Sequence, residues 1–326
     1  MKVIRALVVA LVAVPAMAPA AAGQTFPNRP ITMVMPYSAG GPGDTITRLV
    51  AQGMTQTLKQ QIVVDNTSGA GGSIGSGKVA NAPPDGYTLL MIHVSHATNP
   101  ALYPKLPYDP IKDFEPIGLV VDLPAAFVAR KDLPPESFGQ FLDYVKANRG
   151  NVNFAHAGIG SSAHLCGLLF ASAIGVDITS VPYRGAGPAL NDMMGGRVDA
   201  MCDQIVNVVR HVEAGGIKGY AVTGSERAEA LPNLPTVSAS GLPGFTYQVW
   251  YGLFAPKGTP KPVIDTLVAA LNDALKDPTI KARLAELGAD TVSAARARPE
   301  ALATHLKAEI DKWGPIIKAA GVTGAQ

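Results

Sequence analysis

The sequence predicts an α/β fold in which short apolar strands alternate with longer helices. Two observations support this prediction. Short runs rich in β-branched residues recur along the chain, and most are followed by a glycine- or serine-rich loop and then a segment with helical periodicity. This order favours parallel sheets, with the helix N-termini at the carboxyl ends of the strands.

The first series of elements follows this pattern. Residues 31–38 (ITMVMPYS) are expected to form a strand, followed by the loop AGGPG and a helix that Asp44 or Thr45 caps. The run at 60–66 predicts the next strand, and 73–82 the next helix. A third strand is expected at 87–94.

A second series begins near residue 115 with a long extended run that Pro124 interrupts. It continues with helices and strands in alternation up to residue 225 and is followed by a proline-rich segment at 231–245. A further strand is predicted at 249–258, and the chain closes with two amphipathic helices at 262–278 and 299–317.

The N-terminus has the features of a secretory signal peptide over residues 1–23. Lys2 and Arg5 precede an apolar run from Ala6 to Val14, and small residues follow up to Ala22. Later apolar runs are too short to cross a bilayer. We therefore expect an exported protein of the bacterial periplasm that does not itself span the membrane.

Charge balance argues against a nucleic-acid partner. Of the 27 lysines and arginines, Lys2 and Arg5 belong to the signal peptide, which leaves 25 basic against 25 acidic residues. Binding to a phosphate backbone requires a concentrated basic face.

Cys166 and Cys202 lie in apolar runs, the first helix-like and the second strand-like. The simplest interpretation is two small buried hydrophobic side chains, and a disulfide is the alternative that an oxidising compartment permits. Neither cysteine has a second cysteine or a histidine at zinc-binding spacing, so we expect no metal.

A glycine-rich stretch at 69–80 (GAGGSIGSGKVA) resembles nucleotide-binding loops. From Gly72 it has the spacing of a P-loop, but Val79 occupies the position where a Ser or Thr would bind magnesium. It also contains a loose dinucleotide pattern, without the acidic residue expected about 20 positions later. We therefore expect no nucleotide cofactor, and we expect Lys78 to lie on a solvated face.

Several long stretches, in order through nearly the whole mature chain, resemble one family, the periplasmic receptors of tripartite tricarboxylate transporters, also called Bug-type receptors. They include FPNRPITMVMPYSAGGPGDTITRL, NTSGAGGSIGSGKVANAPPDGYTLL, NFAHAGIGSSAHLCGLLF and VPYRGAGPALNDMMGGRVDAM. The resemblance implies an α/β two-domain periplasmic binding protein, a type II-like Venus flytrap with its ligand cleft between the domains. Domain 1 would comprise 24–122 and 223–326, and domain 2 would comprise 123–222.

The resemblance also implies a function. Such a receptor captures a small carboxylate, a di- or tricarboxylate or an aromatic acid, by domain closure. It delivers the acid transiently to membrane transporter subunits. We expect a monomer without a cofactor and without catalytic activity.

Helix N-termini bind anions through unpaired N–H groups and a partial positive charge, and glycine lets the backbone approach closely. We therefore expect ligand contacts in the loops SAGGPGD, SGAGGSIG, HAGIGSS and VPYRGAG, at strand ends and at one acidic position. The candidate residues are Tyr37, Ser38, Ala39, Gly40, Gly41, Asp44, Gly71, Gly72, Ser95, His96, Gly160, Ser161, Ser162, His164, Tyr183, Arg184 and Asp203.

Structural roles compete with binding at several of these positions. Asp44, Ser161 or Ser162 can act as helix caps, the glycines can serve tight turns, and Arg184 can form a surface or interdomain salt bridge. Asp203 can orient water or hold a backbone turn.

Two other functions remain open from the sequence. A hydrolase could place His156, His164 and Asp203 together, although the G-x-S-x-G and H-E-x-x-H motifs are absent. A ligand-sensing subunit for a membrane kinase would use the same cleft and differ in its partner.

Overall fold

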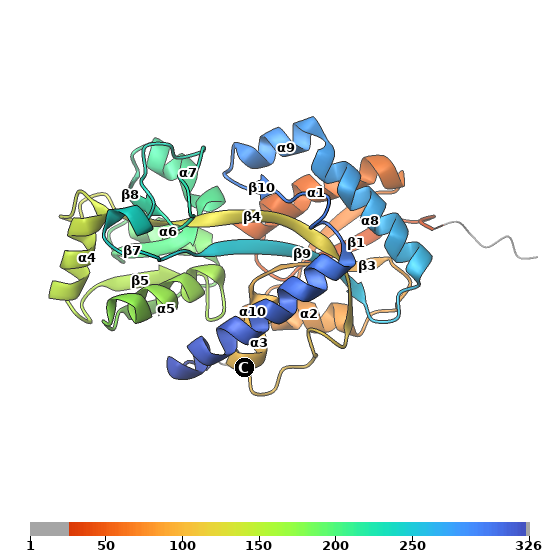
Figure 1. Cartoon of the computed structure of the whole chain (residues 1–326), viewed down its shortest axis with the longest axis horizontal. Helices are drawn as coiled ribbons and strands as arrows, with labels where there is room; N and C mark the ends of the chain where they lie inside the picture. The colour runs from red at the N-terminus through yellow and green to blue at the C-terminus, as the bar shows by residue number, and fades with distance from the viewer. Residues whose placement is uncertain (1–25, 324–326) are drawn as a thin grey trace, which may run out of the picture.

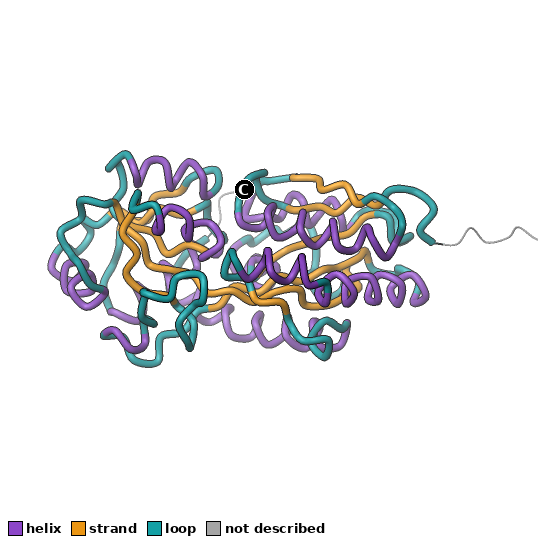
Figure 2. The backbone as a smooth tube through the Cα atoms, turned by 90° about the horizontal axis from the view of Figure 1, so that it is seen from above, coloured by secondary structure: helices purple, strands orange, loops and turns teal. Residues whose placement is uncertain are grey.

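The computed structural model describes residues 26–323, and the predicted signal peptide lies outside them. Two lobes lie side by side and share one mixed sheet, in which ten strands are described (Figure 1). The long strand β4 (Phe114–Arg130) runs through both lobes, and β9 (Gln248–Pro256) pairs antiparallel with its first part. Seen from above, strands form the connection between the two halves (Figure 2).

The first lobe is built on the strand order β2-β1-β3-β9-β4. Its further strands are β1 (Ile31–Met35), β2 (Ile62–Asn66), β3 (Thr88–His93) and β10 (Asp290–Thr291). Its helices are α1 (Pro42–Leu58), α2 (Ser73–Ala80), α3 (Ser95–Leu102), α8 (Lys261–Lys276), α9 (Pro278–Ala285) and α10 (Pro299–Ala319). β1 is almost entirely buried, as expected for a parallel strand covered on both faces.

The second lobe contains the latter part of β4, which pairs antiparallel with β7 and β8. Its further strands are β5 (Asn153–His156), β6 (Thr179–Pro182), β7 (Ala200–Gln204) and β8 (Ile217–Val222). Its helices are α4 (Phe138–Ala147), α5 (Ser162–Ile174), α6 (Ala186–Met194) and α7 (Ile205–Glu213). Aromatic rings that include Phe127, Phe141 and Phe170 fill the core of this lobe.

The alternating pattern correctly predicted an α/β fold, but the expectation of purely parallel sheets was wrong. β9 pairs antiparallel with both β3 and β4, and β4 with β7 and β8. Two helices were also not anticipated. α3 starts directly after β3 in a segment that contains Pro100, and a single residue, Asp277, separates α9 from the end of α8.

The chain crosses between the lobes within β4 and again just before β9. Between β8 and β9, residues 224–247 pack on the second lobe: Val222 exchanges backbone hydrogen bonds with Pro235 and Val237, and the ring of Phe245 lies 6.0 Å from that of Phe127. We therefore propose that the second boundary lies at 247/248 and not at the expected position near 223.

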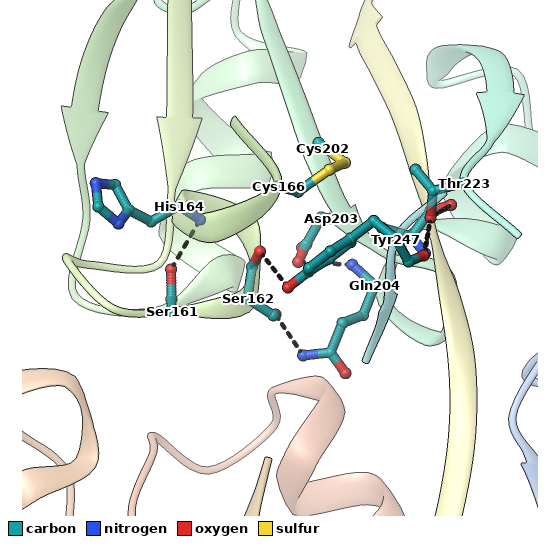
Figure 3. Close-up of a disulfide and its surroundings, with 10 residues drawn as sticks. Ser161, Ser162, His164, Cys166, Cys202, Asp203, Gln204, Thr223 and Tyr247 are labelled. Atoms are coloured by element: carbon teal, nitrogen blue, oxygen red, sulfur yellow. Dashed lines mark hydrogen bonds between the residues drawn. A yellow bond between two sulfur atoms is a disulfide. The ribbon is translucent and has the colours of Figure 1, made fainter. Parts of the chain in front are cut away.

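Cys166 of α5 and Cys202 of β7 form a disulfide, with their Cα atoms 5.9 Å apart (Figure 3). The interpretation as two unpaired buried side chains was therefore wrong. The bond fixes the N-terminal part of α5 to the neighbouring strand. Within residues 26–323, none of the helices combines the length and the apolar character needed to cross a membrane.

Candidate ligand-binding cleft

A cavity of about 100 Å³ lies between the two lobes, and residues of both line it. The first lobe contributes the end of β1 with the following loop, the end of β3 and the middle of β9. The second lobe contributes the loops before α5 and α6 and the end of β7. Pockets for drug-sized molecules measure roughly 300–1,000 Å³, so this arrangement suits a small ligand.

Three helix N-termini converge on this cavity. The N-cap residues are Gly41 for α1, Ser161 for α5 and Gly185 for α6, and all three line it. Gly185 has a φ of 113°, a conformation that glycine adopts at little cost. Arg184 lies directly before this cap. Unpaired N–H groups and partial positive charge therefore face the same small space, which the basic residue Arg184 also lines.

Direct contacts between the lobes show that the cleft is closed. The Tyr251 hydroxyl of β9 donates to Gln204 Oε1 of the second lobe at 2.9 Å. The Tyr103 hydroxyl, at the end of α3, donates to the carbonyl of Ile159 at 3.3 Å. Gly71 lies so near this carbonyl that an added Cβ would be 3.0 Å from the oxygen.

Gln204 connects several of these groups, because both ends of its side-chain amide are hydrogen bonded. Its Nε2 donates to Ser162 Oγ at 2.8 Å, and its Oε1 accepts from Tyr251. The carbonyl of Ser162 in turn accepts from the hydroxyl of Tyr247 at 2.9 Å (Figure 3). Since Ser162 Oγ accepts the bond from Gln204, its own hydroxyl proton remains available for an acceptor in the cavity.

Asp203 brings a negative charge to the cavity. The residue is 2% exposed, and its oxygens accept from Gln204 N at 2.8 Å and from Asn207 Nδ2 at 2.6 Å. Burial raises the pKa of its carboxyl to about 6, and the two hydrogen bonds oppose this only in part. At neutral pH the carboxylate is therefore largely ionised and costly to keep buried.

The wall formed by β1 and β3 is aromatic and uncharged. The rings of Tyr37 and His93 stack with their centroids 4.6 Å apart, and the Tyr37 hydroxyl donates to the carbonyl of Gly71 at 2.9 Å. Burial lowers the pKa of His93 to about 3, so the imidazole is neutral, and its Nδ1 accepts from Ser95 N. Burial likewise raises the pKa of Tyr37.

Many of the predicted contact residues lie together in this cavity. They come from four separate segments and are Tyr37, Ser38, Ala39, Gly40, Gly41, Ser161, Ser162, Arg184 and Asp203. Their assignment as ligand contacts stays a prediction, but the structure places all nine residues in the lining of one cavity.

Asp44, Gly71 and Gly72 do not line the cavity. α1 begins at Pro42 with Gly41 as its N-cap, so Asp44 lies within the first turn and accepts from Gly40 N at 2.9 Å. The expected capping role of Asp44 or Thr45 was therefore wrong. Burial opposes ionisation of Asp44, but hydrogen bonds from Arg48 and Gly40 outweigh it and lower the pKa.

The second glycine-rich loop has another role. The carbonyl of Gly71 accepts from Tyr37 and from Asn99, and its backbone lies against Ile159 of the other lobe. The loop therefore supports the closed arrangement at one side of the cavity. Lys78 forms an ion pair with Asp65 at 2.5 Å on the surface.

Ser95, His96 and Tyr183 also lie outside the cavity lining. α3 starts directly at the end of β3, which directs His96 into the aromatic core between Phe114 and Phe254. Burial there lowers its pKa to about 3. Ser95 is fully buried, and the Tyr183 hydroxyl donates to Asp192 at 2.8 Å.

Gly160 and His164 face other parts of the structure. An added Cβ on Gly160 would approach Leu102 and Asn99 of the first lobe. His164 borders a larger cavity of about 620 Å³ between α5, β5, β6 and the end of α10. Its Nδ1 accepts from Gly160 N, and its ring lies 4.7 Å from that of His156.

Sequence reasoning missed several lining residues, notably His93, Gly185, Gln204 and Tyr251. Gly185 lies inside the expected contact loop VPYRGAG but was not among the candidate residues, and Gln204 directly follows the candidate Asp203. Tyr251 lies inside an apolar strand, and nothing in the sequence around it marks it as a lining residue.

The hydrogen bonds do not form the triad that a hydrolase would need from His156, His164 and Asp203. His156 Nε2 contacts Ser180 Oγ at 2.8 Å, and its Nδ1 accepts from Gly158 N, so no carboxylate orients this ring. Asp203 is bonded to Gln204 and Asn207. Within the described residues, no group of three or more His, Cys, Asp or Glu side chains is placed to hold a metal ion.

Comparison with known proteins gives a consistent result. Residues 46–322 match the model of the tripartite tricarboxylate transporter family receptors. A protein of Agrobacterium vitis, from the TAR-I ttuE–ttuC' intergenic region, is 46% identical over 302 residues, which are 93% of this chain and 87% of that protein.

Solved structures agree with this match. The periplasmic binding protein BugD is 45% identical with a TM-score of 0.87, over 91% of this chain and 99% of that one. MatC of Rhodopseudomonas palustris, solved with bound malate, is 43% identical with a TM-score of 0.85, over 90% and 100%. Another R. palustris protein, solved with adipate, is 33% identical with a TM-score of 0.86, over 91% and 99%.

The fold is thus the two-domain α/β architecture of periplasmic binding proteins, with the cleft between the domains. The chain belongs to the tripartite tricarboxylate transporter receptor family, whose Bug-type members are periplasmic solute-binding proteins.

Proposed function

We propose that this protein is a periplasmic receptor that captures a small carboxylate between its lobes and delivers it to the membrane subunits of a tripartite tricarboxylate transporter. The observation that carries the proposal is the convergence of three helix N-termini and Arg184 on one closed interlobe cavity. Such a site attracts an anion without a cluster of basic side chains.

The bound ligands of similar proteins support the chemical class. MatC holds malate and the second R. palustris protein holds adipate, and both ligands are small carboxylic acids. The ligand would complete its contacts only when both lobes meet, so differential affinity for the closed form would drive closure. The membrane subunits would then recognise the closed receptor.

The first test is a thermal-shift panel on the mature chain with mono-, di- and tricarboxylates, aromatic acids, ATP and NAD. A ligand at a hundredfold excess over its Kd stabilises the fold by about 2.7 kcal/mol. Stabilisation by acids alone supports the proposal. Stabilisation by ATP or NAD with none by any acid would contradict it and would redirect attention to the glycine-rich loop at 69–80.

A matched pair of variants locates the site. Ala39 lies in the loop before α1, lines the cavity and is exposed, so either substitution should fold. Ala39→Asp adds a negative charge beside the expected carboxylate, whereas Ala39→Asn adds a side chain of nearly the same shape without charge. We expect the aspartate variant to lose at least tenfold in affinity relative to the asparagine variant, measured by isothermal titration calorimetry. Equal affinities of the two variants would mean that the carboxylate of the ligand does not bind near Ala39.

A further inference from the structure

Asp203 is unusual in a cavity that otherwise favours anions. Its carboxylate is 2% exposed and lines the same space as three helix N-termini. Its partners are one backbone N–H and one side-chain amide, and none of the described ion pairs includes it. A carboxylate has about four acceptor positions, so two remain for the cavity.

A structural role does not account fully for this residue. The two bonds go to different oxygens, Oδ1 accepting from Gln204 N and Oδ2 from Asn207 Nδ2, so each oxygen keeps a further acceptor position. A buried carboxylate adds a desolvation cost that these two bonds offset only in part. A hydrogen-bond donor supplied by a ligand would satisfy the remaining acceptor positions when the lobes close.

We propose that Asp203 selects the ligand, so that the receptor prefers small carboxylic acids that carry a hydroxyl or ammonium group over the unsubstituted acid of the same carbon chain. This inference rests on the proposed function. The ligand carboxylate lies at the N-termini of α1, α5 and α6, and the donor group on its carbon chain points to Asp203 at the end of β7.

The neighbouring groups offer no protein donor for the remaining acceptor positions of Asp203. Gln204 is held by Ser162 and Tyr251 and cannot turn its amide to donate to Asp203 without breaking both bonds. His93, across the cavity, is neutral because burial lowers its pKa to about 3. Arg184 lies at the anion-binding end, before the α6 cap. A ligand without a donor would leave the carboxylate of Asp203 buried with unfilled acceptor positions.

The test compares ligands that differ only in the donor group. Titration calorimetry at pH 7.5 would use three series, with the hydroxy and amino members in both enantiomeric forms: propionate, lactate and alanine; succinate, malate and aspartate; glutarate, 2-hydroxyglutarate and glutamate. In the series that binds best, we expect the hydroxy or amino acid to bind at least tenfold tighter than the unsubstituted acid. The hydroxyl and ammonium members show which donor the site takes.

Variants assign the preference to Asp203. Asp203→Asn keeps the shape and an acceptor for Gln204 N but removes the charge, and we expect the preference to fall below threefold. Asp143→Asn makes the same change on the exposed face of α4 and should leave the preference unchanged. The wild-type comparison tests the ligand preference itself even if the Asp203 variant does not fold.

The outcomes separate this inference from the proposed function. Equal affinity for substituted and unsubstituted acids would overturn the inference and leave the receptor function standing. A preference that persists in Asp203→Asn would overturn the role of Asp203. If no acid in the three series or in the wider carboxylate panel binds, both are wrong.

Discussion

Burial at the end of β7 gives Asp203 a carboxyl pKa of about 6, compared with about 3.9 for an unfolded chain. Between these values the folded state binds more protons than the unfolded state, so the free energy of unfolding decreases as pH rises from 4 to 6. Asp203→Asn removes this titration. We expect its free energy of unfolding, relative to the wild type, to increase by about 2 kcal/mol between pH 4 and pH 7.

Urea unfolding at pH 4, 5, 6 and 7 without ligand measures this difference. Asp143→Asn is the control, because Asp143 is exposed on α4. A difference that does not change with pH would show that Asp203 titrates normally in the folded protein.

Residue-level prediction placed candidates in the cavity lining where the chain itself marks a loop. Ser38 to Gly41 follow a buried strand and precede a helix, so their place at the mouth of a cleft could be read from the order of elements. The prediction for His96 missed the cavity because α3 begins at Ser95 without a preceding loop, and the rotation of its first turn directs His96 into the core, whereas His93, the last residue of β3, lines the cavity. A single sequence does not define that rotation.

At the scale of elements, the sequence did not reveal the place of β9 in the sheet. Its apolar run predicted a strand, but not that it pairs antiparallel between β3 and β4. That strand order places Tyr251 opposite His93 and within reach of Gln204. Strand order depends on contacts between segments far apart in sequence, which periodicity does not record.

The disulfide links two elements that hold the second wall of the cleft. Cys166 and Cys202 enclose a loop of 36 residues, which contains α6. Closing such a loop restricts the unfolded chain and stabilises the fold by about 3–4 kcal/mol. We expect the double variant Cys166→Ala, Cys202→Ala to lose stability of this order in urea unfolding.

Dithiothreitol provides the control for the disulfide. It should destabilise the wild type to a similar degree and leave the double variant unchanged. If full reduction, verified by thiol titration, does not lower the free energy of unfolding of the wild type, this bond does not stabilise the fold.

At the scale of the whole molecule, the two lobes meet through small residues as well as hydrogen bonds. Gly71 has a φ of 60°, and an added Cβ would lie 2.6 Å from the hydroxyl of Tyr103 and 3.0 Å from the carbonyl of Ile159. Tyr103 is a flexible neighbour in the same lobe, whereas Ile159 belongs to the other lobe. The contact with Ile159 therefore exists only in the closed form.

Gly71→Ala should consequently disfavour closure. Ligand affinity depends on the population of the closed form, so we expect the affinity to fall about tenfold, which corresponds to about 1.4 kcal/mol.

Gly215→Ala is the matched control, because Gly215 has a similar φ of 66° but an added Cβ there meets nothing within 4 Å. Both variants carry the cost of placing alanine in the left-handed region, roughly 1–2 kcal/mol of folding stability. Only Gly71→Ala should weaken binding in calorimetry and reduce ligand-induced compaction in small-angle X-ray scattering. Equal affinities in the two variants would mean that this contact between the lobes does not contribute to capture.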